Sequence, residues 1–141
     1  MKWRVLILIA AAATAVAADH ANQEALDALQ GTWQMQSAMD RGKPVPAGEV
    51  EKSRFVIAGN KLTVYERNKA QGVATITVDA TKKPATIDMQ HGRDQAVQGI
   101  YRLEADTLTI CSGVPGSQRP TEFAAKAGAR NAVMVLKRVK K

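Results

Sequence analysis

The chain has 141 residues, of which 20 are Lys or Arg and 13 are Asp or Glu, and its formal net charge is +7. This length fits one domain rather than several. A positive charge of this size favours solubility and weak attraction of anions, but it identifies no partner. Because Cys111 is the only cysteine, an intramolecular disulfide is excluded and the fold must depend on its core.

The first residues have the features of a secretory signal peptide. Residues 1–4 include the basic Lys2 and Arg4, residues 5–13 carry no charge, and small residues follow up to Ala17 and Ala18. The apolar stretch is shorter than the about 20 residues that a bilayer-spanning helix needs. We therefore expect cleavage near Ala17/Ala18 and no membrane span after processing.

The predicted domain organisation is a signal peptide over residues 1–17 and one domain over residues 18–141. Loss of Lys2 and Arg4 with the signal peptide lowers the net charge from +7 to +5. The expected location of the mature protein is the periplasm or the extracellular space.

One helix is predicted at the start of the mature chain, over residues 19–30. Leu26 and Leu29 are spaced i, i+3, as on one face of a helix. Gly31 follows them and is expected to end the helix.

From residue 32 onward the pattern alternates with period two, which is typical of strands. No stretch of crossover length interrupts the series, so a parallel sheet is not expected. The predicted fold class is all-β: an eight-stranded antiparallel barrel, with the short N-terminal helix closing one end. The eight expected strands are 32–39, 54–58, 61–67, 72–78, 84–89, 98–103, 107–111 and 132–138.

Gly31-Thr32-Trp33 stands between the helix and the first strand. The glycine permits a sharp turn, and Trp33 provides a large apolar side chain at one end of the barrel. In this place, Gly-X-Trp resembles the lipocalin signature. The resemblance implies that the helix and the tryptophan form the barrel floor, with a basic residue of the last strand stacked on the indole ring. Arg138 matches that basic residue, and Lys137 is the alternative.

Further motifs extend the resemblance over residues 26–138. They are LQGTW at 29–33, RGKPVP at 41–46, GIYRL at 99–103, DTL at 106–108 running into Cys111, RPTEF at 119–123 and VLKR at 135–138. Together they are similar to an uncharacterised family of small lipocalin-like domains that is abundant in planctomycete bacteria. The resemblance implies a lipocalin-like barrel in an exported protein, and it implies no activity.

The sequence contains no recognisable catalytic constellation. His20 and His91 are the only histidines, and neither has a second ligand at metal-binding spacing, so both are expected to be exposed loop residues. Gly-rich phosphate-binding motifs are absent. We therefore expect no catalytic residues, no metal, no cofactor and no enzymatic activity. Cys111 follows Leu108 and Ile110 and is expected to be a small buried side chain.

Arg119 and Glu122 lie on either side of Pro120 in a long link. They are interpreted either as a structural ion pair that holds this link against the barrel, or as contacts to a ligand or partner at the open mouth. Use of Glu122 as a catalytic acid or base is a third interpretation.

The first functional hypothesis is a binding protein for a small, partly apolar ligand. An eight-stranded barrel encloses a space that side chains just fill or that holds one small molecule. The candidate contacts at the barrel interior or mouth are Met35, Phe55, Ile57, Val64, Tyr101, Arg119 and Glu122, with Ile76, Met89 and Ile110 also expected to face inward.

The alternative hypothesis is a structural or protein-interaction module of the cell envelope, with a filled barrel, no ligand and a protein partner. Nucleic acid is not an expected partner. Tyr65 followed by Arg67 is the only hint of the aromatic and basic interleaving that such binding needs.

Overall fold

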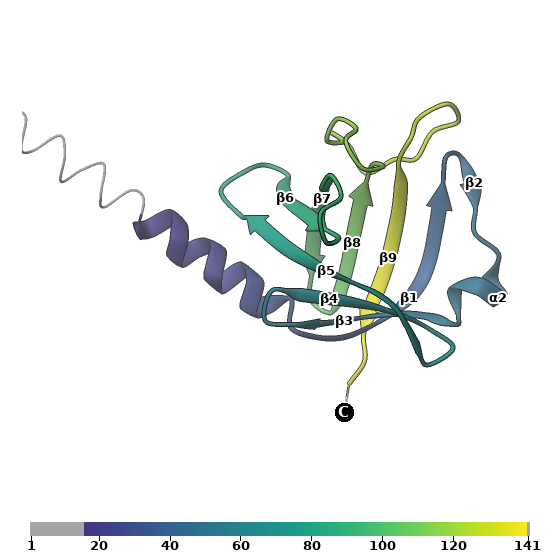
Figure 1. The fold of residues 1–141 in the computed structure, drawn as a ribbon, viewed down its shortest axis with the longest axis horizontal. Coiled ribbons are helices and arrows are strands. Elements are labelled where there is room, and N and C mark those ends of the chain that lie inside the picture. Colours follow the sequence, from purple (N-terminus) through teal and green to yellow (C-terminus); the bar gives the residue numbers. More distant parts are fainter. Residues whose placement is uncertain (1–15, 141) are drawn as a thin grey trace, which may run out of the picture.

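Residues 16–140 are described by a computed structural model of the chain (Figure 1). This part of the chain forms two helices and nine strands. They are α1 (16–28), β1 (Gly31–Asp40), β2 (Lys43–Pro44), α2 (Ala47–Val50), β3 (Ser53–Ala58), β4 (Lys61–Glu66), β5 (Lys69–Asp79), β6 (Ala85–Gln90), β7 (Val97–Glu104), β8 (Thr107–Ser112) and β9 (Ala132–Arg138). The predicted signal peptide falls outside the described residues, except for residues 16 and 17, which belong to α1.

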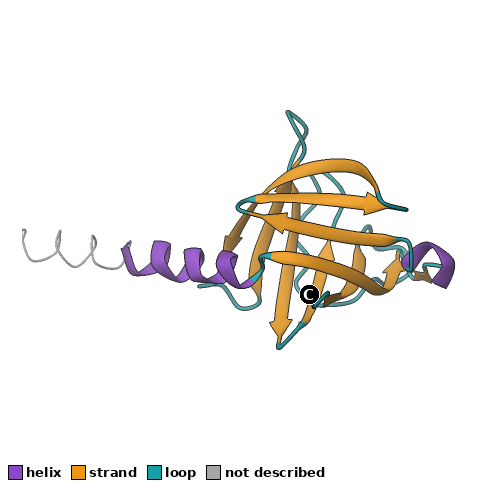
Figure 2. Cartoon of the chain, turned by 90° about the horizontal axis from the view of Figure 1, so that it is seen from below, coloured by secondary structure: helices purple, strands orange, loops and turns teal. Residues whose placement is uncertain are grey.

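Eight of the strands close into an antiparallel barrel (Figures 1 and 2). Each strand from β3 to β8 pairs with the next in chain order, and β1 pairs with both β3 and β9. This arrangement confirms the predicted all-β fold class. The ninth strand, β2, pairs only with the end of β1, where Asp40 lies opposite Lys43.

The alternation of side chains along each strand separates core from surface. In the β3–β4 pair, Phe55 lies opposite Val64 and both face the interior. The next pair in the register, Arg54 and Tyr65, lies on the outer face, with the guanidinium carbon 5.4 Å from the ring centroid. The period of two in the sequence is therefore enough to place the apolar side chains of these strands in the barrel interior.

Two short elements and one strand start differ from the prediction. β2 and α2 were not expected, because elements of two and four residues show no hydrophobic periodicity. β5 starts at Lys69, three residues earlier than predicted. The β4–β5 turn is made by Arg67 and Asn68, both with positive φ. The pairing register between β4 and β5 shifts after Val64, as at a β-bulge.

The barrel has two different ends. The turns β3–β4, β5–β6 and β7–β8 gather at one end, where α1 lies beside the barrel, and α2 lies at the opposite end (Figure 2). Gln30 donates a hydrogen bond to the Gly59 carbonyl (2.8 Å), and Asn22 accepts one from the Ala80 amide (2.8 Å). We call the end of the barrel beside α1 the α1 end, and the end beside α2 the open end.

α1 ends two residues before the predicted boundary. Leu29 bonds back to the Leu26 carbonyl (3.1 Å) in a tight last turn, and its side chain is fully buried in the barrel core. Within residues 16–140, no helix is long and apolar enough to span a membrane.

Candidate ligand-binding site

Trp33 plugs the α1 end of the barrel. Its side chain is fully buried, and its Nε1–H donates to the Leu29 carbonyl at 2.9 Å. Arg138 of β9 stacks on the indole, with its guanidinium carbon 4.3 Å from the ring centroid. The contact implied by the lipocalin resemblance is therefore present, and it is made by Arg138. Gly31 has a φ of 127°, and a Cβ there would lie 3.3 Å from Arg138 Nη1, which explains the glycine.

Arg138 also ties α1 to the barrel. Its guanidinium donates to the carbonyls of Ala28 (2.8 Å) and Gln30, and its Nε lies 3.1 Å from Asp106 Oδ1. The carbonyls at the C-terminal end of a helix lack partners within the helix. One side chain therefore satisfies two backbone carbonyls and pairs with a carboxylate.

The barrel interior is largely filled by its own side chains. The buried cluster comprises Leu29, Trp33, Phe55, Ile57, Leu62, Ala74, Ile76, Val78, Ile87, Met89, Tyr101, Leu108, Ile110 and Leu136.

At the open end, β1 separates from β3. β1 pairs with β3 only over residues 31–34, whereas it pairs with β9 as far as Asp40. A bulge at Gln36 contributes to the bend of β1. Residues 41–52, which contain β2 and α2, cross the resulting opening, and we call them the arch.

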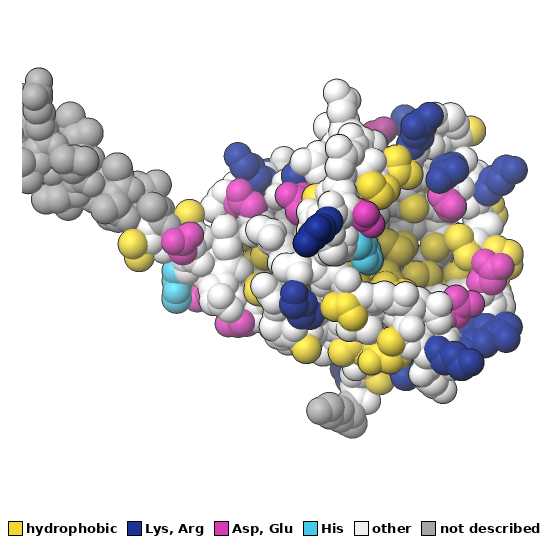
Figure 3. Space-filling model, viewed as in Figure 1, with side chains coloured by type: hydrophobic (Ala, Val, Ile, Leu, Met, Phe, Trp, Pro, Cys, Tyr) yellow, Lys and Arg dark blue, Asp and Glu magenta, His cyan; other side chains and the backbone are white. Residues whose placement is uncertain are grey.

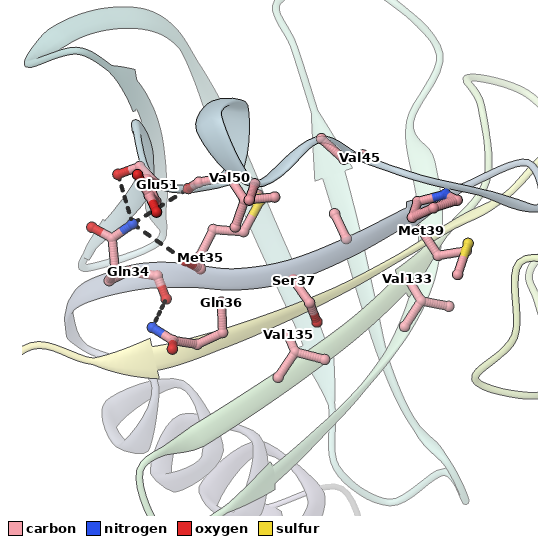
Figure 4. A pocket seen from close by; sticks show the side chains of 13 residues that line it. Gln34, Met35, Gln36, Ser37, Met39, Val45, Val50, Glu51, Val133 and Val135 are labelled. Atoms are coloured by element: carbon pink, nitrogen blue, oxygen red, sulfur yellow. Dashed lines mark hydrogen bonds between the residues drawn. The ribbon is translucent and has the colours of Figure 1, made fainter.

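The arch is held by hydrogen bonds to β1. The Val45 amide donates to the Ala38 carbonyl at 2.9 Å. The side-chain amide of Gln34 donates to the carbonyl of Glu51 (3.1 Å) and more weakly to that of Val50 (3.4 Å) (Figure 4). It also donates to the carbonyl of Ser53 on β3 (3.0 Å). Gln34 therefore links the two strands at the point where their backbones part.

Two adjoining cavities lie between β1 and the arch. The larger, about 650 Å³, follows the edge of β1: Met35 extends toward Val50, whereas Val133 and Val135 of β9 lie on the other side of β1 (Figure 4). It is lined by Gln34, Met35, Gln36, Ser37, Ala38, Met39, Pro44, Val45, Ala47, Val50, Glu51, Val133 and Val135.

The smaller cavity, about 280 Å³, lies inside the barrel mouth, and we call the two together the mouth site. This face of the molecule is hollowed, with hydrophobic side chains on the floor of the hollow and charged ones around it (Figure 3). The cavities share Met35, Ala38 and Val45. The smaller one is completed by Asp40, Glu49, Ser53, Glu66, Ala132 and Met134.

The charges at the mouth site are negative. Asp40, Glu49 and Glu66 line the smaller cavity and Glu51 lines the larger one. Among the described residues, no Lys, Arg or His lines either cavity. Asp40 is paired with Arg41, whose Nε lies 3.7 Å from Asp40 Oδ1, whereas Glu49, Glu51 and Glu66 form no ion pair within the described residues. A lining with three such carboxylates is less favourable for an anion than for a neutral molecule.

The predicted interior residues all face inward. Phe55, Ile57 and Tyr101 belong to the buried cluster, as do the other three expected inward residues, and Met35 and Val64 pack against it. Of these, Met35 lines the mouth site, whereas Phe55, Ile57 and Tyr101 serve the packing of the core. Burial raises the pKa of the Tyr101 hydroxyl, which keeps it neutral.

The predicted ion pair between Arg119 and Glu122 is wrong. Arg119 Nη1 lies 2.7 Å from Asp88 Oδ1 of β6, whereas Glu122 pairs with Lys126 at 3.1 Å. Arg119 has nearer partners on the outer face of the sheet than in its own loop. The prediction that Arg119 lies at the barrel mouth is also wrong, because its partners lie on the outer face of the sheet. Glu122 is an exposed loop residue that lines neither cavity.

The two histidines are far apart in the fold. His91 is an exposed residue of the β6–β7 link, as predicted. His20 is exposed as predicted, but it lies on α1 rather than in a loop, and its Nε2 is 3.0 Å from Glu24, one turn along the helix. Within residues 16–140, no group of three His, Cys, Asp or Glu side chains could hold a metal ion.

Cys111 is a fully buried residue on the outer face of β8, beneath the β8–β9 link. Its Sγ lies 3.7 Å from the Ala124 carbonyl and 3.6 Å from Asn131 Nδ2. Burial raises the pKa of the thiol, which disfavours the reactive thiolate. The predicted small buried side chain is confirmed.

We expect the Cys111 thiol to react with Ellman's reagent at least about 100-fold more slowly in the folded protein than in urea, because access requires a costly local opening. The rate of thionitrobenzoate release at pH 8 measures this ratio. Equal rates in the two states would show that the β8–β9 link does not cover the thiol.

Comparisons with protein-family models, curated proteins and solved structures found no match for this chain. The resemblance to lipocalin-like domains therefore stays a prediction.

Four residues of the mouth site were not predicted from the sequence: Gln34, Val45, Val50 and Met134. The only available signal was the unusual length and proline content of the link at residues 41–51.

Proposed function

We propose that this protein binds a small, largely apolar ligand at the mouth site. The observation that supports the proposal is the separation of β1 from β3, which leaves a cavity of about 650 Å³ between β1 and the arch, while the barrel interior is largely filled. Ligand sites of small molecules have volumes of about 300–1,000 Å³. The cavity walls are formed mainly by aliphatic side chains and methionines.

The lining favours a neutral ligand over an anionic one. Met35 and Met134 are flexible and polarisable, so they adapt to different apolar shapes. The three carboxylates without an ion pair, Glu49, Glu51 and Glu66, make the lining less favourable for a negatively charged ligand than for a neutral one. The carbonyl groups near Gln34 already have a donor, so hydrogen bonds to the ligand are expected to be few.

We expect the neutral probe N-phenyl-1-naphthylamine to bind and the Val45→Trp variant to bind it at least about tenfold more weakly, since the indole fills the shared part of the two cavities. The rise in probe fluorescence on titration measures the affinity. Val73→Trp is the matched control, because Val73 is 52% exposed on β5 and lines neither cavity. Binding that is equal in both variants, or absent from the natural chain, would sink the proposal.

A protein-interaction module is the second candidate. The filled buried cluster favours it, because this cluster leaves no space for a ligand deep in the barrel. Native mass spectrometry of protein from its own host distinguishes the two. A bound small-molecule mass supports the ligand proposal, and a larger complex without such a mass supports the alternative.

We further propose export of the protein, on the basis of the N-terminal pattern alone. The same mass spectrum tests it, because a chain that begins at or next to Ala18 has lost the signal peptide. A chain that retains residues 1–17 would contradict export by this route.

A further inference from the structure

A second cavity lies on the outside of the barrel, away from the mouth site. It has a volume of about 600 Å³ and rests on the outer face of β5, β6 and β7. Thr77 lies opposite Asp88, and Thr86 lies opposite Ile100, so strand pairing places these side chains on one patch. Arg119, Pro120 and Thr121 of the β8–β9 link form one wall, and Lys82 and Lys83 of the β5–β6 link also line it. We call this the outer groove.

Arg119 is fixed in position in the outer groove. Its Nη1 donates to the Gly99 carbonyl at 2.8 Å and lies 2.7 Å from Asp88 Oδ1. Its side chain remains 27% exposed, and within the described residues Nε and Nη2 donate no hydrogen bond. These two nitrogens form the edge of a guanidinium that binds a carboxylate through two parallel hydrogen bonds.

The charges of the outer groove leave a small positive excess. The charge of Asp88 is compensated by Arg119. Asp79 accepts hydrogen bonds from the hydroxyl (2.5 Å) and the amide (3.0 Å) of Thr81. These bonds lower the pKa of Asp79 and keep it ionised. Lys82 and Lys83 form no ion pair within the described residues. Three cations and two carboxylates therefore suit one negative charge better than two.

We propose that the outer groove binds a small hydroxylated carboxylate, such as a sugar acid. The free edge of Arg119 takes the carboxylate, and the lysines add a favourable charge. The hydroxyls of Thr77, Thr86 and Thr121 both donate and accept hydrogen bonds, as the hydroxyls of such a ligand require. Ile100 and Pro120 offer an apolar surface to its C–H groups. This site shares no residue with the mouth site.

Titration with D-glucuronate, D-glucose and glucose 6-phosphate, followed by amide chemical shifts in NMR, tests the proposal. Glucuronate is expected to shift the amides of Thr86, Ile100 and Thr121, and to bind at least about tenfold more tightly than either other sugar. Equal affinity for glucose, tighter binding of the phosphate, or no saturable shift with glucuronate would overturn it.

Variants separate a binding role of the groove from a structural one. Lys82→Gln/Lys83→Gln is expected to weaken glucuronate binding by about 5–10-fold, whereas Lys52→Gln/Lys69→Gln, the same charge change at the open end, leaves it unchanged. Arg119→Gln is expected to abolish binding. Because Arg119→Gln also removes the contact with Asp88, its effect alone does not separate binding from structure. The two double lysine variants do: if both weaken glucuronate binding equally, the proposal is contradicted.

Discussion

Replacing Trp33 by alanine is expected to lower the free energy of unfolding by about 3–5 kcal/mol, the usual cost of removing a large buried aromatic side chain. Trp33 is fully buried, and its loss removes the hydrogen bond to the Leu29 carbonyl and the surface on which Arg138 stacks. Small domains have only about 5–15 kcal/mol of stability in total. The variant is therefore expected to lose a large share of its stability and to unfold at a markedly lower urea concentration.

Urea denaturation followed by circular dichroism measures the effect of Trp33→Ala. Val73→Ala serves as the control, since Val73 is exposed on the outer face of β5 and its change is expected to stay within about 0.5 kcal/mol. Trp33→Phe is expected to lie between the two, because it keeps an aromatic ring but not the N–H donor. If Trp33→Ala lost no more than the Val73 variant, Trp33 would not be the plug of the α1 end.

Replacing Arg138 by alanine is expected to lower the free energy of unfolding by about 2–4 kcal/mol at neutral pH, since hydrogen bonds to charged groups contribute about 1.5–3 kcal/mol each but are not additive. The change leaves the carbonyls of Ala28 and Gln30 without their donor and Asp106 with Lys140 as its remaining partner. Lys137→Ala is the matched control, because Lys137 is the exposed neighbour on β9. Equal effects of the two variants would contradict the role of Arg138.

The effect of Arg138→Ala should depend on pH. The hydrogen bond from Arg138, and after it the one from Lys140, lower the pKa of Asp106 below its ordinary value of 3.8. A lowered pKa in the folded state stabilises the protein above the pKa of the unfolded chain, and this contribution is lost as the pH falls through the folded pKa. The difference in stability between the natural chain and Arg138→Ala is therefore expected to narrow below about pH 3.8. A difference that stays constant down to pH 2 would exclude the ion pair as its source.

Much of the barrel could be predicted from local pattern. Phe55, Ile57 and Val64 face inward because neighbouring residues of a strand point to opposite sides, and this alternation is visible in the sequence. The contact between Trp33 and Arg138 joins residues more than one hundred positions apart, and it was expected only through the resemblance to lipocalins. The four-residue helix α2 has no periodic pattern, so the arch was expected only as a long link.

The partners of Arg119 show why side-chain contacts in links are harder to predict. Glu122 is close in sequence and has the opposite charge, but Arg119 pairs with Asp88, thirty-one positions away. The pairing of β6 with β7 brings Asp88 and the Gly99 carbonyl together on the outer face. Only the tertiary arrangement supplies these two acceptors at once.

The sequence by itself determined the class of the fold, the number of barrel strands and the residues of the core, because each follows from alternation along a single strand. The tertiary structure decided where space remains. The mouth site exists because β1 remains paired with β9 beyond the point where its pairing with β3 ends. The outer groove exists because the β8–β9 link lies over the outer face of β5, β6 and β7. Both depend on which distant segments pair and where that pairing stops, and no local pattern encodes this.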